Sequence, residues 1–413
     1  MSSVIYSFAC KKDPVQRLEL LETEEPLPGG DAAAVTFKIL RGSLTANNKF
    51  YWSFGERPPF NFNRCYPVDP ARSKLLDGGD TPNDYFHPVV WGICEVTSSN
   101  VEGVEIGTQY MAMLPMGETV SFARAHVKED DEDILVVDRP ATFSAYNQFT
   151  KIDADSPLST SCEHSDTALV CFPGIVTGHG LYYRMLRTDC YGTDTVVVTS
   201  ASSKVALAMA LYMRNDPDKK FAHTKIVGYT SSSNVEFCKK TGLYDDVIGY
   251  HEMLPQSTKC VMIDIAGRGD IYTKNNNAPA VDVAKLLVVG NSSGADDKDS
   301  TAKTFSFPAT IKMALAMMGL PARLHSWMDP KQQLYLIWED MAAMKEEMGG
   351  EEMKKTQKEY SLAFCKFAKE WMRAKEAETE EEVRQAFVDI LQGSVLPSEF
   401  IALDVAKAVA HRR

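Results

Sequence analysis

A run of small hydroxylic residues with one lysine stands between two apolar stretches of the sequence. The stretch before it, Thr195–Thr199, holds three consecutive valines and favours a parallel strand buried on both faces. The stretch after it, Ala206–Met213, consists mainly of Ala, Leu and Met and favours a helix. A turn there would bring backbone N–H groups and the positive end of a helix dipole to a phosphate. The candidate anion-binding residues are Ser200, Ala201, Ser202, Ser203, Lys204 and Val205.

The same turn admits two simpler interpretations. Dinucleotide-binding turns carry the fingerprint Gly-x-Gly-x-x-Gly, and here Ser200, Ser203 and Ala206 stand at the glycine positions. Because serine restricts φ more than glycine does, an ordinary strand-to-helix turn without a ligand stays open as an alternative. Lys204 at a helix N-terminus is unfavourable for the dipole, which a bound anion would offset. Its alternative is a lysine that points into solvent.

Strand and helix patterns alternate after this turn. We expect strands at Lys225–Thr230, Asp246–Tyr250, Cys260–Ile265 and Lys285–Gly290, and a short helix at Asn234–Thr241. Such alternation predicts an α/β fold with a doubly wound parallel sheet. Ligands of these sheets bind beyond the carboxyl ends of the strands. Further cofactor-binding candidates are therefore Thr230, Ser231, Ser232, Tyr250, Ala266, Gly267, Gly290 and Asn291.

The end of the second strand bears on the choice of cofactor. An NAD-binding protein usually carries Asp or Glu there for the ribose 2′-hydroxyl, whereas Tyr229–Asn234 offers hydroxyl groups. This favours NADP (NADPH), with Lys204 as a substitute for a basic residue after the strand. The alternative is a neutral loop that contacts no ribose.

Composition limits the class of protein. The chain has 413 residues, of which 44% are hydrophobic and 24% charged, as in globular proteins of two or three domains. A net charge of −12 argues against a general nucleic-acid surface. Nine scattered cysteines without a Cys-x-x-Cys pair indicate free thiols, and no apolar run is long enough for a membrane span. We expect a cytoplasmic protein, with an organelle as the open alternative.

The flanking regions differ from the central one. Residues 1–150 read mostly as strands, including 34–40, 89–96 and 108–114, with a long aromatic loop at 50–70. Residues 332–348 and 351–376 predict long helices, and 400–410 predicts a strand or a short helix. On the second long helix one face gathers aromatic residues, which indicates a core contact or, alternatively, a partner surface. These residues are Tyr360, Phe364, Phe367 and Trp371.

Several stretches, in this order and spacing, resemble the medium-chain dehydrogenase/reductase superfamily. Residues 92–107 are similar to its glycine-punctuated strand signature, and residues 176–181 to the Thr-containing helix before its cofactor domain. Ser43–Asn48 together with Ser200–Lys204 looks like an uncharacterised branch, a domain family of unknown function. The resemblance implies a GroES-like β-barrel domain at 1–165, a Rossmann-like dinucleotide-binding domain at 166–310 and a helical extension at 311–413 that returns to the β domain.

The similarity is to the zinc-free quinone and enoyl reductases. The positions where zinc-dependent members carry Cys, Gly-His-Glu and Cys are near Asn47, Val90 and Pro173, and none of these ligands is present. We therefore expect no metal site. In that group a bound nicotinamide carries the hydride. The resemblance places Thr177 against the nicotinamide carboxamide and Tyr250 against the adenine half.

The resemblance also points to catalytic candidates in the aromatic loop. Asn48 and Tyr51 lie where similar reductases place groups that face the nicotinamide. The Tyr51 hydroxyl could donate a proton after hydride transfer, and the alternative is a packed aromatic side chain.

Two functions follow as hypotheses. The first is a zinc-independent, NADPH-dependent reductase of an activated C=C or C=O in an apolar small molecule. The alternative is a catalytically silent protein that senses a dinucleotide or binds a partner. The resemblance implies a homodimer, for which Lys285–Gly290 is the expected sheet edge.

Overall fold

The computed structural model describes residues 3–11, 17–25, 33–53, 55, 61–76, 81–139, 144–265, 267–290 and 331–413. The chain forms two compact units, which we call the β unit and the α/β unit. The β unit comprises Met1–Val170 and Phe367–Arg413, and the α/β unit comprises Cys171–Lys366. The predicted domain boundaries at 165 and 310 stay a prediction.

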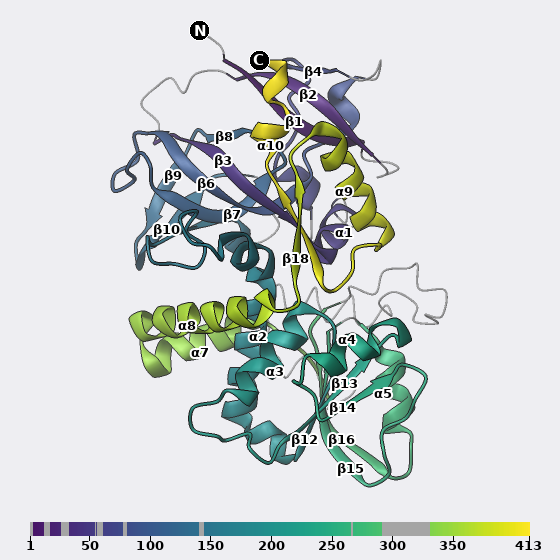
Figure 1. The fold of residues 1–413 in the computed structure, drawn as a ribbon. Helices are drawn as coiled ribbons and strands as arrows, with labels where there is room; N and C mark the ends of the chain where they lie inside the picture. Colours follow the sequence, from purple (N-terminus) through teal and green to yellow (C-terminus); the bar gives the residue numbers. More distant parts are fainter. Residues whose placement is uncertain are drawn as a thin grey trace. The chain divides into compact units, whose positions relative to one another are not determined.

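The β unit holds two sheets (Figure 1). The smaller has the order β4-β2-β1-β5, formed by Ser73–Leu75, Leu18–Glu25, Ser3–Lys11 and Tyr85–Phe86. The larger has the order β18-β19-β3-β6-β7-β11-β10-β9, and β8 also pairs with β3. Its strands are β3 (Val35–Leu44), β6 (Val89–Ser99), β7 (Gln109–Pro115), β8 (Thr119–Phe122), β9 (Ala125–Lys128), β10 (Asp131–Val137), β11 (Gln148–Lys151), β18 (Arg373–Ala377) and β19 (Glu399–Leu403).

Helices α1 (Ala46–Ser53) and α9 (Glu380–Gln392) pack on each other in this unit. The Trp52 ring stacks on Phe387 with centroids 4.4 Å apart, and both side chains are fully buried. A Thr379–Glu382 capping box begins α9, satisfying N–H groups that a helix start would leave open. Short helical turns complete the unit at Phe62–Arg64 (η1), Pro82–Asp84 (η2), Ser144–Asn147 (η3), Val405–Ala408 (α10) and Ala410–Arg412 (η6).

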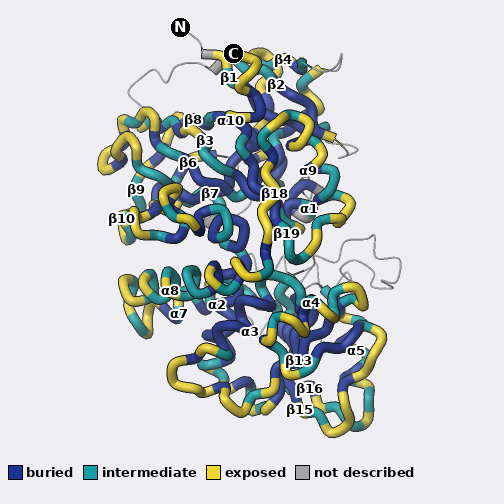
Figure 2. The backbone as a smooth tube through the Cα atoms, viewed as in Figure 1, coloured by how far each residue is buried: buried dark blue, intermediate teal, exposed yellow. Residues whose placement is uncertain are grey.

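The α/β unit is built on a six-stranded parallel sheet with the order β14-β13-β12-β15-β16-β17. Its strands are β12 (Thr195–Thr199), β13 (Lys225–Thr230), β14 (Asp246–Gly249), β15 (Thr258–Asp264), β16 (Val281–Val288) and β17 (Gln332–Leu334). Figure 2 shows how deeply the central strands are buried. This confirms the predicted doubly wound parallel sheet.

Helices surround this sheet. They are α3 (Lys204–Arg214), α4 (Val235–Lys240), α5 (Gly269–Asn276), α7 (Ile337–Met348), α8 (Gly350–Lys369) and α2 (Ser165–Gly192), which crosses the boundary of the units. A short turn, η4 (Ser232–Asn234), precedes α4. None of the helices described here is both long and apolar enough to cross a membrane.

Three expectations about secondary structure need correction. Residues 332–334 form a strand, because they pair with β16, so the helix begins only at Ile337. Lys285–Gly290 is therefore not the sheet edge; β16 lies between β15 and β17. Arg373–Ala377 forms β18, because pairing with β19 overrides its helical composition.

The aromatic face of α8 is a core contact where it lies in the α/β unit. Phe364 is fully buried, and the Tyr360 ring lies 4.5 Å from that of Tyr212 and 4.7 Å from the imidazole of His179. This confirms the core interpretation for those two residues. The predicted end of the chain resolves into both alternatives, since β19 is followed by α10.

Candidate functional site

The Ser200–Ser203 turn lies at the carboxyl end of β12, in the middle of the parallel sheet. Ser200 has φ +53°, a left-handed conformation that costs a non-glycine residue about 1–2 kcal/mol. Ser203 caps α3, since its Oγ accepts a hydrogen bond of 3.3 Å from the Ala206 N–H. The strand, tight turn and helix N-terminus predicted for this stretch are thus confirmed, and Ser200, at the first glycine position, has a positive φ that glycine adopts without strain.

Two hydrogen bonds fix Ala201 of the turn in place. The Ala201 N–H donates to the Tyr229 carbonyl of β13 at 2.9 Å, and the Tyr244 hydroxyl donates to the Ala201 carbonyl at 2.6 Å. The Ser202 Oγ accepts a hydrogen bond of 3.2 Å from Asn234 Nδ2. The turn is therefore fixed to the end of the neighbouring strand.

Helix α2 packs closely on the start of α3. A Cβ on Gly174 would lie 2.8 Å from that of Lys204, and one on Gly178 would lie 2.6 Å from that of Ala208. Thr177, half-buried between these glycines in sequence, thus lies on the part of α2 that meets α3. Lys204 is half-buried, and burial lowers the pKa of its ammonium group while the Cys171 thiol opposes that shift.

A buried carboxylate joins β12 to β15. The Asp264 Oδ1 accepts hydrogen bonds from the Thr199 hydroxyl at 2.7 Å and from the Arg268 N–H at 2.8 Å. Burial raises the pKa of this carboxyl group, and the bond from Thr199 opposes the rise. Sequence reasoning missed Asp264 and Arg268; the signal available was a single acid at the end of an apolar strand.

The candidate cofactor-binding residues in the loops after the other strands differ in burial and in their contacts. Thr230 is buried and its side chain bonds Cys238, whereas Ser231 is half-buried and Ser232 exposed. Gly290 lies against the end of β15, since a Cβ there would be 2.8 Å from the Ile265 carbonyl oxygen. Gly267 has φ +75°. Ala266 and Asn291 lie outside the described residues.

Tyr250 and Arg268 are in contact at the carboxyl end of the parallel sheet. The Arg268 guanidinium lies 4.3 Å from the centroid of the Tyr250 ring, and the Tyr250 hydroxyl oxygen is 3.2 Å from Ser200 Oγ. The structure therefore brings together Ser200, Tyr250 and Arg268, of which sequence reasoning had named the first two.

The catalytic candidates lie in the β unit. The Tyr51 hydroxyl accepts a hydrogen bond of 3.3 Å from Trp91 Nε1, and its ring lies 4.9 Å from Phe62. Tyr51 is 7% exposed, and burial raises its pKa, so the phenol keeps its proton. Asn48 is engaged on both sides of its amide. Its Oδ1 accepts from the Thr45 N–H at 2.7 Å, and its Nδ2 donates to the Val89 carbonyl at 3.1 Å.

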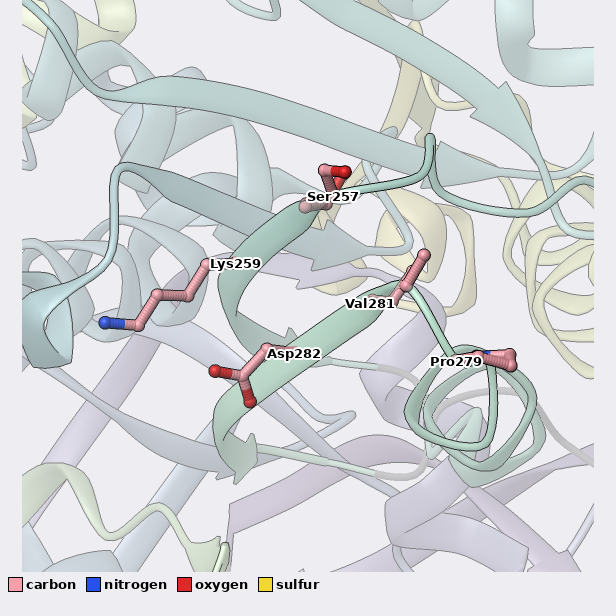
Figure 3. Close-up of a pocket in the computed structure, with 7 residues that line it drawn as sticks. Ser257, Lys259, Pro279, Val281 and Asp282 are labelled. Carbon is pink, nitrogen blue, oxygen red and sulfur yellow. The ribbon is translucent and has the colours of Figure 1, made fainter.

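A hollow of about 280 Å³ lies at the opposite end of the parallel sheet (Figure 3). It is lined by residues before and at the start of β15 and β16, including Ser257, Lys259 and Asp282. Because ligands of open α/β sheets bind at the carboxyl ends, this hollow is not the candidate site. Within the described parts of the chain, no three His, Cys, Asp or Glu side chains are grouped to hold a metal ion.

Comparisons with solved structures give the fold. CurA from Vibrio vulnificus, solved in complex with NADPH, is 14% identical with a TM-score of 0.50, over 97% of this chain and 99% of that chain. Etr1p, solved with NADP and crotonyl-CoA, is 12% identical with a TM-score of 0.52, over the same shares of the two chains. The chain thus has the predicted medium-chain reductase fold with its GroES-like and Rossmann parts.

Comparisons at the level of sequence give the family. No curated protein matches the chain. The profile of the protein family of unknown function DUF2855 matches residues 43–396, which is most of the sequence. The chain therefore belongs to the DUF2855 family, and it has the medium-chain reductase fold.

Proposed function

We propose that this chain is a zinc-independent reductase that binds NADP(H) at the Ser200–Ser203 turn and reduces an activated C=C or C=O. The observation that carries the proposal is the left-handed Ser200 between a central parallel strand and a capped helix N-terminus. That geometry sets the positive end of the α3 dipole at the carboxyl end of the sheet, where a phosphate would bind. The presence of NADPH or NADP in the structures of CurA and Etr1p supports the same cofactor here.

The residues of the α/β unit fit such a cofactor. The turn and the start of α3, with Lys204, would hold the pyrophosphate. Ser231 and Ser232 would face the ribose 2′-phosphate, and no acid stands on η4 to repel it. Thr177, Gly267 and Gly290 would adjoin the nicotinamide half. Bound NADPH supplies the hydride.

Tyr51 is the proposed proton donor of the β unit. The Tyr51 hydroxyl oxygen accepts a hydrogen bond from Trp91 Nε1. The proton that Tyr51 would donate to the substrate is its own phenolic proton. Its raised pKa keeps it protonated at neutral pH. Aromatic side chains around it (Phe62, Trp91 and Tyr146) suit an apolar small substrate. Chemistry at Asn48 stays a prediction, and its hydrogen bonds give it a structural role between α1 and β6.

Titration with NADPH and, separately, NADH tests the proposal, followed by nicotinamide fluorescence. We expect saturable binding of NADPH that is much tighter than that of NADH. A folded sample that binds neither would overturn the cofactor assignment. Tyr51→Phe should then abolish turnover of an enoyl or quinone substrate without loss of NADPH affinity.

A second function is a dinucleotide sensor without turnover. The burial of Tyr51 and the internal hydrogen bonds of Asn48 favour it, because both candidate catalytic side chains also serve packing. NADPH binding with no turnover of any carbonyl, quinone or enoyl compound would distinguish it from the reductase.

A homodimer and a cytoplasmic location stay predictions. In the order of the parallel sheet, the strands at the two edges are β14 and β17, and a dimer formed by edge pairing would use one of them. Light scattering gives the mass in solution; a monomeric mass would remove the dimer.

A further inference from the structure

The hydroxyl group of Ser200 is hydrogen-bonded to a side chain of the protein itself. The Ser200 and Tyr250 hydroxyl oxygens lie 3.2 Å apart and share a hydrogen bond. Burial raises the pKa of the Tyr250 phenol, and the hydrogen bond with the Ser200 side chain opposes that rise. This hydroxyl is a group that the turn would offer to a phosphate.

The Tyr250 ring is held firmly in that position. The Tyr250 N–H donates to the Thr230 carbonyl at 3.1 Å, which continues the pairing of β13 with β14. The Arg268 guanidinium lies over the ring at 4.3 Å, within the range of a cation–π contact. Arg268 is fixed in turn by Asp270, through bonds of 2.9 Å from Nε and 3.0 Å from Nη2. The ring is thus stacked from one side and hydrogen-bonded at its tip.

We propose that Tyr250 is an affinity-determining residue whose hydroxyl group covers the Ser200 side chain and must leave it when a dinucleotide phosphate binds. This inference rests on the proposed function. A simple contact of Tyr250 with the adenine half of the dinucleotide would be a different role. In the role proposed here, the Tyr250 hydroxyl competes with the ligand for Ser200.

The sign of the effect of removing the hydroxyl separates the two roles. A competing hydroxyl lowers affinity, so Tyr250→Phe should bind NADPH more tightly than wild type, by about threefold to tenfold for one hydrogen bond. A hydroxyl that contacts the ligand gives the opposite change. A ring that only stacks on the adenine gives none.

The chain offers a matched control at the same turn. Tyr244 also donates a hydroxyl hydrogen bond there, but to the Ala201 carbonyl, which supports the turn rather than covers it. Tyr244→Phe should therefore bind NADPH no more tightly than wild type. Both variants lose one phenolic oxygen from one tyrosine of the α/β unit, so a general effect of that loss would appear in both.

The experiment is a fluorescence titration of wild type, Tyr250→Phe and Tyr244→Phe with NADPH, with the fold of each checked by circular dichroism. Tighter binding confined to Tyr250→Phe supports the inference. Unchanged or weaker binding by Tyr250→Phe, with binding by wild type, overturns the inference and leaves the proposed function standing. Absence of binding in all three folded proteins overturns the proposed function, and the inference with it.

Discussion

Replacement of Gly178 by alanine should separate α2 from α3 and destabilise the α/β unit. A Cβ at this position would lie 2.6 Å from the Ala208 Cβ, 2.9 Å from the Met209 nitrogen and 3.0 Å from the Val205 oxygen. Two of these three atoms belong to the backbone of α3, so no side-chain rotation relieves the overlap. The helix itself must shift.

The magnitude follows from the cost of overpacking. Extra volume in a well-packed interior costs about 1–3 kcal/mol, which exceeds the gain of about 1 kcal/mol that alanine brings to a helix over glycine. For a unit of this size each kcal/mol lowers the melting temperature by about 2–4 °C. We expect Gly178→Ala to melt several degrees below wild type and to bind NADPH more weakly, because Val205 and Lys204 begin the helix that must move.

Thermal unfolding followed by circular dichroism, with and without NADPH, measures both effects. Gly269→Ala is the matched control, since it opens helix α5 and an added Cβ there meets nothing within 4 Å. It should melt within about a degree of wild type, because surface changes away from contacts stay within about 0.5 kcal/mol. Equal melting temperatures for Gly178→Ala and Gly269→Ala would refute the reasoning.

Three further predictions concern charge. Because burial lowers the pKa of Lys204 and a bound phosphate would favour its charged form, NADPH affinity should fall as pH rises through that lowered pKa; titrations across pH should show the fall in wild type and not in Lys204→Gln. The pKa of Asp264 is raised on folding, so its contribution to stability falls as pH rises above the ordinary value of about 3.9; Asp264→Asn should remove that slope from urea unfolding measured between pH 4 and 7. Asp340 is fully buried and accepts a 2.7 Å bond from Arg184 Nε, so Asp340→Ala should cost about 3–5 kcal/mol in urea unfolding, and a loss below 1 kcal/mol would contradict the pairing.

The sequence contained the local signals of the cofactor turn. The three valines of β12 are buried on both faces of the sheet, and the small residues after them form the tight turn that their size permits. These features depend on neighbours along the chain. Periodicity and residue size therefore sufficed to predict them.

Features that depend on distant pairing were not accessible in this way. Arg373–Ala377 has a helical composition and becomes a strand only because β19 lies beside it. The bonds of Asp264 to Thr199 and of Tyr250 to Ser200 join the ends of different strands. No spacing in the sequence encodes which of these side chains meet.

The pairing of β19 with β3 has a consequence for synthesis of the chain. Ile401 pairs with Leu44 and Leu403 with Gly42, so one end of β3 gains its second neighbour only after residues 399–403 have been translated. The α/β unit lies between β3 and β19 in the sequence as one continuous segment, so it can fold before β19 is translated. Until residues 399–403 emerge, the backbone N–H and C=O groups of Gly42–Leu44 form an open edge that can pair with another nascent chain. Chaperone dependence of expression should therefore concentrate on the β unit.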